Sequence, residues 1–347
     1  MQCTLLIPHL FPPGGFGDDL CRDLALDNLR KFLARSHHLS FDAIDATGWL
    51  CQAFEVEKQL DWPVAPLTLT VDGGEANDAY WLRADPVHLQ ARRDQLQLAD
   101  GNMLKVSKQE ADELVATLNH HFADHGMVFL APHPGRWYLR LAHRPEITTH
   151  APGSVAGGNI NALLPAGRDA LNWHGIVNEI QMLLHEHAVN EARETRNEMA
   201  INSVWLWGGG AKTAVPGRHF SAVWSDNALA TALAAGADIH AAALPDHAGR
   251  WLRAAGAAPA SGNVHHLIVL EQLDAAAQYG NAGQWRENIA ALDRDWLAPL
   301  LQALQQRRIS RIALVAPGGR RCQRFEATPL DLLKFWRKTR PLSAYAT

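Results

Sequence analysis

Residues 202–210 read Asn-Ser-Val-Trp-Leu-Trp-Gly-Gly-Gly, so a short apolar segment with two tryptophans runs directly into three glycines. The apolar part predicts a buried β-strand. In α/β proteins ligands bind at the carboxyl ends of the strands, where glycine lets backbone N–H groups approach them closely. Trp207, Gly208, Gly209 and Gly210 are therefore candidate ligand-binding residues. The same pattern also fits a buried strand that is closed by a flexible turn.

Strand and helix patterns alternate near the two ends of the chain. The expected core elements are strands at 3–10, 222–223, 264–270 and 309–316, and helices at 24–33, 228–235 and 288–305. Strand, helix and strand in this order predict a parallel βαβ unit with a right-handed crossover. The fold class is therefore α/β.

The middle of the chain has a different pattern. Ser107 and Glu110 have the spacing of a capping box, and the helix that follows them is expected to close at Gly126. Strands are expected at 79–89, 127–130 and 137–141, and a second helix at 169–187. These elements predict a small α+β unit.

Composition narrows the classes of partner. The 347 residues are 47% hydrophobic and 20% charged, which is enough to bury a large core in more than one domain. The net charge of −4 provides no basic field for nucleic acid, and no segment approaches the roughly 20 apolar residues of a membrane span. Four well-separated cysteines predict reduced thiols. We expect a cytoplasmic protein that binds neither nucleic acid nor a membrane.

The run from residue 163 to 210 resembles the archaeal-type cofactor-independent phosphoglycerate mutases of the alkaline phosphatase superfamily. That family has a Leu-Pro-Xaa-Gly turn, a helix, a His-Pro-Val-Asn-Xaa-Xaa-Arg segment and then an Asn-Xaa-Ile-Trp-Leu-Trp-Gly-Gln-Gly strand and loop. The matching positions are Leu164, Pro165, Gly167, His187, Val189, Asn190, Arg193, Asn202, Trp205, Trp207, Gly208 and Gly210. Ala188 and Gly209 depart from the pattern. The same features resemble proteobacterial proteins described as regulators of pathogenicity factors.

This resemblance implies an alkaline-phosphatase-like core with a mostly parallel sheet, helices on both faces and an inserted smaller α+β cap. The boundaries that we expect are core residues 1–92, cap residues 93–199 and core residues 200–347. Asn190 and Arg193 match the family outright, and they serve either the ligand site or the junction of cap and core.

Mutases of this type use two divalent metals and a serine or threonine nucleophile at the ends of the core strands. Acidic and histidine ligands are necessary for that chemistry. The first strand here ends in Ile7-Pro8-His9-Leu10, where the family has aspartate and glycine. Asp274 is followed by Gln278 and Tyr279 where the family has histidine, and the last strand ends in 317-Pro-Gly-Gly-Arg-Arg-321 where it has Asp-His. The sequence thus predicts no dinuclear site and no cofactor.

Several other residues could form a different site. Arg320 and Arg321 could hold phosphate or carboxylate without a metal, and Arg136 and Arg140 flank Tyr138 where the family has Tyr-Arg. Solvated loop arginines are the competing interpretation. The weaker metal candidates are Asp246, His247 and Asp274, together with Asp18, Asp19 and the histidines at 120, 121, 125, 133, 185 and 187.

The function that these observations favour is a catalytically silent relative of the mutase, a regulatory protein that binds a small anion or a protein partner. The alternative is a phosphoglycerate mutase or phosphatase with rearranged ligands, which would need Mn or Zn. A third possibility is a structural adaptor, because twelve tryptophans exceed ordinary usage and aromatic anchors dominate interfaces.

Overall fold

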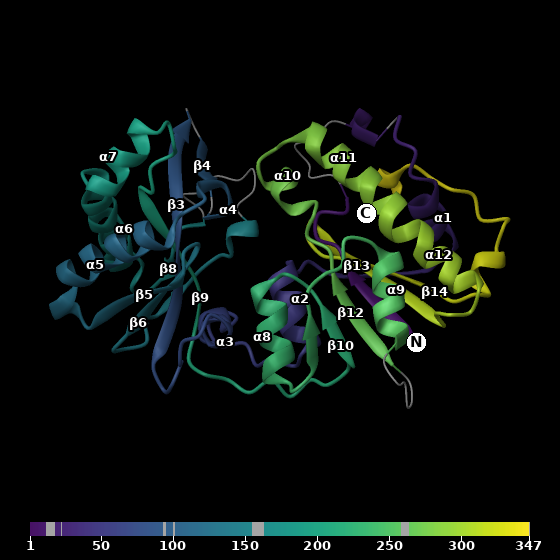
Figure 1. The fold of residues 1–347 in the computed structure, drawn as a ribbon, viewed down its shortest axis with the longest axis horizontal. Coiled ribbons are helices and arrows are strands. Elements are labelled where there is room, and N and C mark those ends of the chain that lie inside the picture. Colours follow the sequence, from purple (N-terminus) through teal and green to yellow (C-terminus); the bar gives the residue numbers. More distant parts are fainter. Residues whose placement is uncertain are drawn as a thin grey trace. The chain divides into compact units, whose positions relative to one another are not determined.

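The structure is a computed structural model that describes residues 1–11, 18–21, 23–92, 95–99, 101–154, 163–257 and 264–346. The chain forms two compact units, and Figure 1 labels their elements. Unit 1 is Met1–Glu55 with Pro216–Thr347, and unit 2 is Val56–Val215. Unit 2 extends beyond the expected cap of residues 93–199 at both ends. The reason is that β3 (Tyr80–Arg92) and β9 (Ser203–Gly210), on either side of that segment, pair with each other.

Unit 1 is built on a seven-stranded sheet in the order β11-β10-β12-β1-β13-β14-β2. The first five strands in this order are parallel, and β14 and β2 join antiparallel at one edge. The bounds are β1 Gln2–Leu6, β2 His37–Asp42, β10 Ala222–Trp224, β11 His240–Ala242, β12 His265–Val269, β13 Arg311–Ala316 and β14 Arg321–Ala327. The mostly parallel α/β sheet is therefore confirmed.

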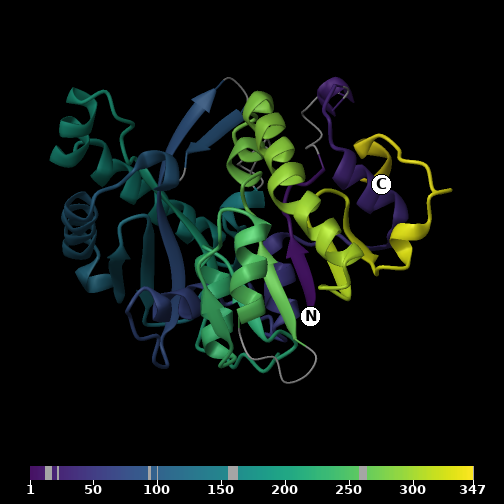
Figure 2. The ribbon, with the colours of Figure 1, turned by 45° about the vertical axis from the view of Figure 1, so that its right-hand side comes forward.

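Helices pack on this sheet because successive strand residues point to opposite faces. The bounds are α1 Asp27–Arg35, α2 Ala46–Ala53, α8 Ala228–Gly236, α9 Ala248–Ala257, α10 Asp274–Gln278, α11 Ala282–Leu292, a π-helix Asp293–Leu297 and α12 Ala298–Gln305. Figures 1 and 2 show α9, α11 and α12 over the sheet. The helix expected at 288–305 is thus the end of α11, the π-helix and α12.

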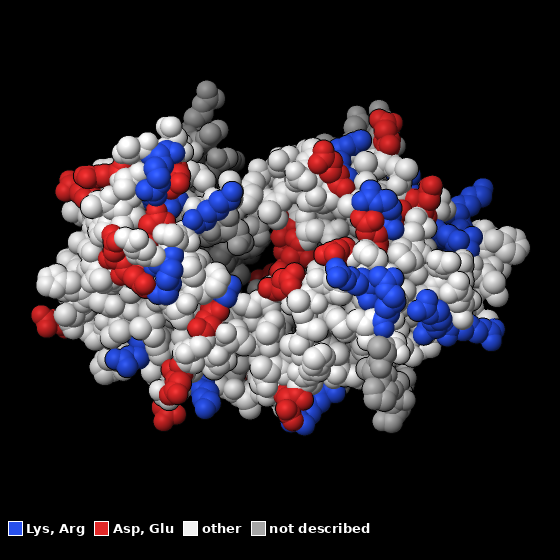
Figure 3. Space-filling model, viewed as in Figure 1, with Lys and Arg blue, Asp and Glu red and all other residues white. Residues whose placement is uncertain are grey.

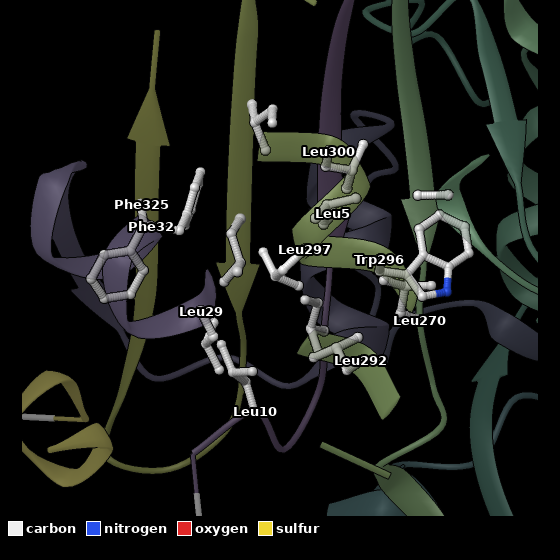
Figure 4. Packing of buried hydrophobic residues seen from close by; sticks show 14 of the residues in the cluster. Leu5, Leu10, Leu29, Phe32, Leu270, Leu292, Trp296, Leu297, Leu300 and Phe325 are labelled. Carbon is white, nitrogen blue, oxygen red and sulfur yellow. The ribbon is translucent and has the colours of Figure 1, made fainter. Parts of the chain in front are cut away.

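One hydrophobic cluster joins the sheet of unit 1 to these helices. Figure 4 shows Leu5 of β1, Phe32 of α1 and Leu297 of the π-helix among the side chains of this cluster, and all three are buried. Asp293 of the π-helix also binds α1, because its Oδ1 accepts a hydrogen bond from the Leu29 N–H at 2.5 Å. The cluster holds β1 and α1 in place, although residues 12–17 between them lie outside the described part.

Unit 2 contains a five-stranded antiparallel sheet in which β4, β3, β6 and β5 follow one another and β9 also pairs with β3. The remaining bounds are β4 Gln95–Ala99, β5 Met127–His133, β6 Arg136–Leu141, β7 Ile147–Thr148 and β8 Ala166–Gly167, with β7 and β8 forming a small separate sheet. The expectation that residues 202–210 end at the carboxyl edge of the parallel sheet is wrong. Strand β9 instead belongs to the antiparallel sheet, where it pairs with β3, and its bounds include the three glycines.

The helices of unit 2 cover this antiparallel sheet. They are α3 Val64–Val71, α4 Gly101–Leu104, α5 Lys108–His121, α6 Ala170–His185 and α7 Ala188–Thr195. The capping box of α5 is confirmed: Ser107 Oγ accepts from the Glu110 N–H at 3.2 Å, and Glu110 Oε2 accepts from the Ser107 N–H at 2.9 Å. Short 3₁₀ helices lie at Asp18–Cys21, Ala123–His125, Pro152–Ser154, Asp331–Leu333 and Leu342–Tyr345. No helix in the described ranges is long and apolar enough to cross a membrane.

Candidate functional site

The carboxyl ends of the five parallel strands of unit 1 meet at one edge of the sheet, where α/β proteins place their ligands. Strand β10 is followed by Ser225, Asp226 and Asn227, and β12 is followed by Glu271 and, three residues later, Asp274. Of these residues, only Asp274 was expected from the sequence. Polar residues directly after an apolar strand are the signal that could have found Asp226 and Glu271.

Asp226, Glu271 and Asp274 form what we call the acidic group. Asn227 Nδ2 donates to Glu271 Oε1 at 2.6 Å, and Asp226 Oδ1 accepts from the Leu244 N–H at 3.1 Å. Asp274 Oδ1 is buried and has no hydrogen-bond partner among the described residues. Figure 3 shows acidic atoms gathered on the visible face near the ends of these strands.

Burial and mutual repulsion shift the titration of two of these carboxyl groups. Burial raises the pKa of Asp274 well above its ordinary value, and the charge of Glu271 raises it further. Burial also raises the pKa of Glu271, where the hydrogen bond from Asn227 works in the opposite direction and Asp226 adds repulsion. Carboxyls in this state keep protons that an exposed carboxyl would lose, which is the property of a general acid or of a neutral hydrogen-bond donor.

The ends of β1 and β13, by contrast, carry no carboxylate. Strand β1 leads to His9, whose backbone carbonyl accepts from Trp285 Nε1 at 3.0 Å and whose pKa is lowered by burial, which disfavours the charged imidazolium. Strand β13 leads to Pro317, Gly318 and Gly319, and both glycines have a positive φ, of 95° and 74°. These glycines turn the chain into β14.

The expectation that the chain has no dinuclear metal site concerns the side chains that could serve as ligands at this edge. In the described part of the chain, no group of three or more His, Cys, Asp or Glu side chains is arranged to hold a metal ion. Asp246 lies on the surface and pairs with Arg250 at 2.9 Å, while His247 Nδ1 accepts from the Arg250 N–H at 3.3 Å. The side chains of Asp18 and Asp19 lie outside the described part.

The six candidate histidines lie in unit 2. His121 Nε2 lies 3.3 Å from Glu179 Oε2, and His187 caps α7 by accepting from the Val189 N–H at 3.2 Å. These contacts are those of helix ends and surface pairs. No metal group includes these histidines among the described residues.

Trp207 binds a buried ion pair in unit 2. Its Nε1 donates to Asp85 Oδ2 at 2.7 Å, and Asp85 Oδ1 accepts from Arg83 Nη2 at 2.6 Å. The Arg83 guanidinium lies 5.2 Å from the ring centroids of both Tyr138 and Trp207. Trp207 thus provides the Asp85 carboxylate with a hydrogen-bond donor inside the unit, which a buried carboxylate needs in addition to its ion pair.

The three glycines after Trp207 are buried against neighbouring side chains. A Cβ on Gly208 would lie 2.8 Å from Val64 Cβ, and Gly208 has a φ of +63°. A Cβ on Gly209 would lie 2.6 Å from the Tyr80 hydroxyl, and one on Gly210 would lie 2.5 Å from Pro63 Cβ. The structure places α3, β3 and the residue before α3 where a ligand was expected.

Asn190 and Arg193 are almost fully buried in unit 2. Asn190 Nδ2 donates to the Ile201 carbonyl at 2.9 Å, and its Oδ1 accepts from the Ile201 N–H at 2.7 Å. Arg193 Nη1 donates to both carboxylate oxygens of Glu110 at 3.0 Å, and Nη2 donates to the Leu104 carbonyl at 2.6 Å. Both side chains brace α7 within unit 2.

The four candidate anion-binding arginines fall in two places. In unit 2, Arg136 Nε donates to Asp72 Oδ2 at 2.8 Å and Arg140 is exposed on β6. In unit 1, Arg321 Nε donates to Ser40 Oγ at 2.6 Å, and the exposed Arg320 follows the glycine turn. Arg320 thus lies on the turn between β13 and β14, and Arg321 is the first residue of β14, so both follow the last parallel strand as expected.

Comparisons with known proteins agree on one group of relatives. No protein-family model matches the chain. A probable 2,3-bisphosphoglycerate-independent phosphoglycerate mutase of Geobacter sulfurreducens is 26% identical over 161 residues, which is 45% of this chain and 39% of that protein. A 2,3-bisphosphoglycerate-independent phosphoglycerate mutase of Methanosarcina mazei is 27% identical over 110 residues, 30% of this chain and 27% of that protein. The matches thus span less than half of either relative.

Solved structures resemble nearly the whole chain. A protein of Pyrococcus horikoshii matches with a TM-score of 0.57 and 13% identity, over 94% of this chain and 87% of that one. The cofactor-independent phosphoglycerate mutase of Thermoplasma acidophilum matches with a TM-score of 0.50 and 14% identity, over 99% of this chain and 94% of that one. The chain is therefore similar in sequence to parts of cofactor-independent phosphoglycerate mutases, and it shares their mixed α/β fold.

Proposed function

We propose that this protein is a divergent relative of the cofactor-independent phosphoglycerate mutases that has lost the dinuclear metal site, does not catalyse the mutase reaction and acts in regulation by binding a small anion or a protein partner. One observation carries the proposal. The ends of β1 and β13 offer one imidazole, from His9, and no carboxylate, so the acidic group at this edge follows β10 and β12 and not β1 and β13, the two strands at whose ends the family has further metal ligands.

Two-metal phosphoryl transfer needs several ligands in a single arrangement. Each ion needs its own donors, and the two ions must lie about 3.5–4 Å apart to act on both the attacking and the leaving oxygen. The turn at Gly318 and Gly319 provides no side-chain ligand for a metal ion, and His9 provides at most one. Losses in a site that works as a unit are strongly non-additive, so a partial donor set does not give partial activity.

The acidic group favours a second candidate, a phosphoglycerate mutase or phosphatase with rearranged ligands that uses Mn or Zn. Ser225 is a hydroxyl residue at the end of a core strand, and its Oγ accepts from the Asn227 N–H at 2.9 Å. Asp226 follows it directly, and Glu271 binds Asn227. A serine next to carboxylates is a possible nucleophile if a metal lowers the pKa of its hydroxyl.

The deciding experiment combines metal analysis with an activity assay. The protein is purified without chelator, its metal content is measured, and interconversion of 2- and 3-phosphoglycerate is assayed with added Mn²⁺ or Zn²⁺ beside an authentic mutase. We expect no stoichiometric metal and no turnover. Metal in the wild type together with turnover that is lost in Ser225→Ala and Asp274→Asn, but kept in the surface control Asp246→Asn, would establish the rearranged enzyme instead.

Anion binding has its own test at the turn between β13 and β14. A ligand that binds only the native state raises its stability, so phosphate or 3-phosphoglycerate should raise the melting temperature. The rise should disappear when Arg320 and Arg321 are both changed to Ala, and it should persist in the exposed control Arg218→Ala. If the rise is the same in the double variant, these arginines do not form the anion site.

A further inference from the structure

The segment 328–340, which follows β14, exposes large apolar side chains. Phe335 is 80% exposed and Trp336 65%, and Leu330 and Leu333 are exposed to a similar extent. The rings of Phe335 and Trp336 contact each other edge to face, with centroids 5.4 Å apart. Single exposed apolar residues are ordinary, but a contiguous group of large ones marks an interaction site.

The backbone of this segment is fastened to unit 1. Thr328 N–H donates to Asp331 Oδ2 at 2.8 Å, Arg337 Nη1 donates to the Ser36 carbonyl at 2.9 Å, and Leu332 is buried in the core cluster. The aromatic side chains therefore point outward from a held backbone, so they need no ordering of the segment before they bind.

The charge of the segment around the apolar side chains is net positive. The basic residues of the segment are Lys334, Arg337, Lys338 and Arg340. Asp331 is its one acidic residue, which gives a net charge of +3 in a chain whose total is −4. Asp331 is paired with Lys334 at 2.5 Å, and in the described part of the chain the side chains of Lys338 and Arg340 form no ion pair. In Figure 3, uncharged atoms protrude over this segment with Lys and Arg atoms on both sides.

We propose that the segment 328–340, through Leu330, Leu333, Phe335 and Trp336 with the cations that flank them, docks unit 1 on an anionic lipid surface. Aromatic and leucine side chains enter the boundary between headgroups and acyl chains, while lysine and arginine contact lipid phosphates. Charge complementarity identifies the occupant as anionic, and the outward projection of the rings suits a deformable surface. The chain would lie on the membrane, which is compatible with the lack of a spanning helix among the described residues.

Such docking differs from the expectation that composition alone provides. A net charge of −4 averages over the whole chain, whereas interactions between exposed charges reach only about 8–10 Å at physiological salt. A lipid surface in contact with this segment therefore responds to its local +3 and not to the total charge.

The test is flotation of the full chain with phosphatidylcholine vesicles that either contain or lack phosphatidylglycerol. We expect binding to the anionic vesicles that weakens with added salt. The double variant Phe335→Ser with Trp336→Ser should bind at least about tenfold more weakly, because interfacial binding scales with buried apolar area. Its matched control is Leu171→Ser with Met182→Ser, since both residues are highly exposed in unit 2.

A charge variant separates the electrostatic part. Lys338→Ala with Arg340→Ala should weaken binding by about fivefold for each charge, and the control Lys212→Ala with Arg218→Ala should leave it unchanged. Each substituted side chain is exposed, so circular dichroism and melting temperature should match those of the wild type.

Two outcomes would overturn the proposal. One is that the wild type does not float with anionic vesicles, or floats equally well without phosphatidylglycerol. The other is that the wild type fails to float but forms a dimer in sedimentation that the Phe335/Trp336 variant abolishes, which would assign the segment to contact between two copies.

Discussion

Gly208 lies in the Trp-Gly segment, and replacing it tests whether these glycines serve packing or ligand approach. Gly208 has a φ of +63°, and its N–H donates to Thr149 Oγ1 at 3.1 Å. An alanine Cβ would lie 2.8 Å from Val64 Cβ and 3.4 Å from Val64 Cγ2. Because Val64 begins α3, the overlap can be relieved only by moving that helix or the strand.

The expected loss of stability has two parts. A residue with a Cβ costs roughly 1–2 kcal/mol in the left-handed region. Overpacking a buried site typically costs about 1–3 kcal/mol more. Gly208→Ala should therefore destabilise unit 2 by about 2–5 kcal/mol, which for a unit of this size corresponds to a fall of about 4–20 °C in melting temperature. The loss should therefore appear in the global unfolding of unit 2 and not only at a local cleft.

The assay is urea and thermal unfolding followed by tryptophan fluorescence and circular dichroism. Gly175→Ala is the matched control, because Gly175 lies in α6 with nothing within 4 Å of the added Cβ. This control should gain up to about 1 kcal/mol from better helix propensity. If Gly208→Ala is as stable as the wild type and loses only ligand binding, the glycines face a ligand and the packing argument is refuted.

Two further predictions concern buried charges. Arg193→Met should destabilise unit 2 by about 3–5 kcal/mol in urea unfolding, because Glu110 loses a buried ion-pair partner. Arg196→Met is the control, since this side chain is 49% exposed and its loss should cost less than about 1 kcal/mol. Equal losses in the two variants would contradict a structural role for the buried Arg193–Glu110 pair. The raised pKa of Asp274 means that the folded state keeps a proton that the unfolded chain has lost, so stability should fall as pH rises above the ordinary value of 3.8 towards the raised pKa. Asp274→Asn should reduce this fall in melting temperature between acid and neutral pH, with the raised pKa of Glu271 accounting for part of what is left, and Asp246→Asn should not change it. An unchanged pH profile in Asp274→Asn would show that Asp274 does not contribute to the fall.

Local patterns predicted several elements correctly. The capping box at Ser107 and Glu110 is present, because its hydrogen bonds join residues only three positions apart. Strands β1, β12 and β13 are apolar runs that are buried on both faces, as central strands of a parallel sheet are. By contrast, β2 and β14, which pair with each other, were not expected. Strand β2 is mostly exposed at the sheet edge, and its sequence, His-His-Leu-Ser-Phe-Asp, has no continuous apolar run.

The candidate site shows the same limit. Asp274 and Glu271 could be found from their place after the strand 264–270, and Asp226 from its place after the strand at 222–223. That the three lie at one edge depends on strands β10 and β12, which are adjacent in the sheet but about forty residues apart in sequence. Arg320 could be placed after the last core strand, but the contact of Arg321 with Ser40 depends on the pairing of β14 with β2.

The sequence by itself determined that this protein is an α/β chain with an α+β unit, that residues 203–207 are an apolar segment with two tryptophans ahead of three glycines, and that the ends of β1 and β13 lack carboxylates. These properties depend on residues next to each other in the chain. Only the tertiary structure decided that β9 pairs with β3 in unit 2, so that Trp207 contacts Asp85 and Gly208 contacts α3. An apolar strand can pair in either sheet, and the choice depends on which buried charges and side-chain volumes it satisfies once the distant strands are assembled.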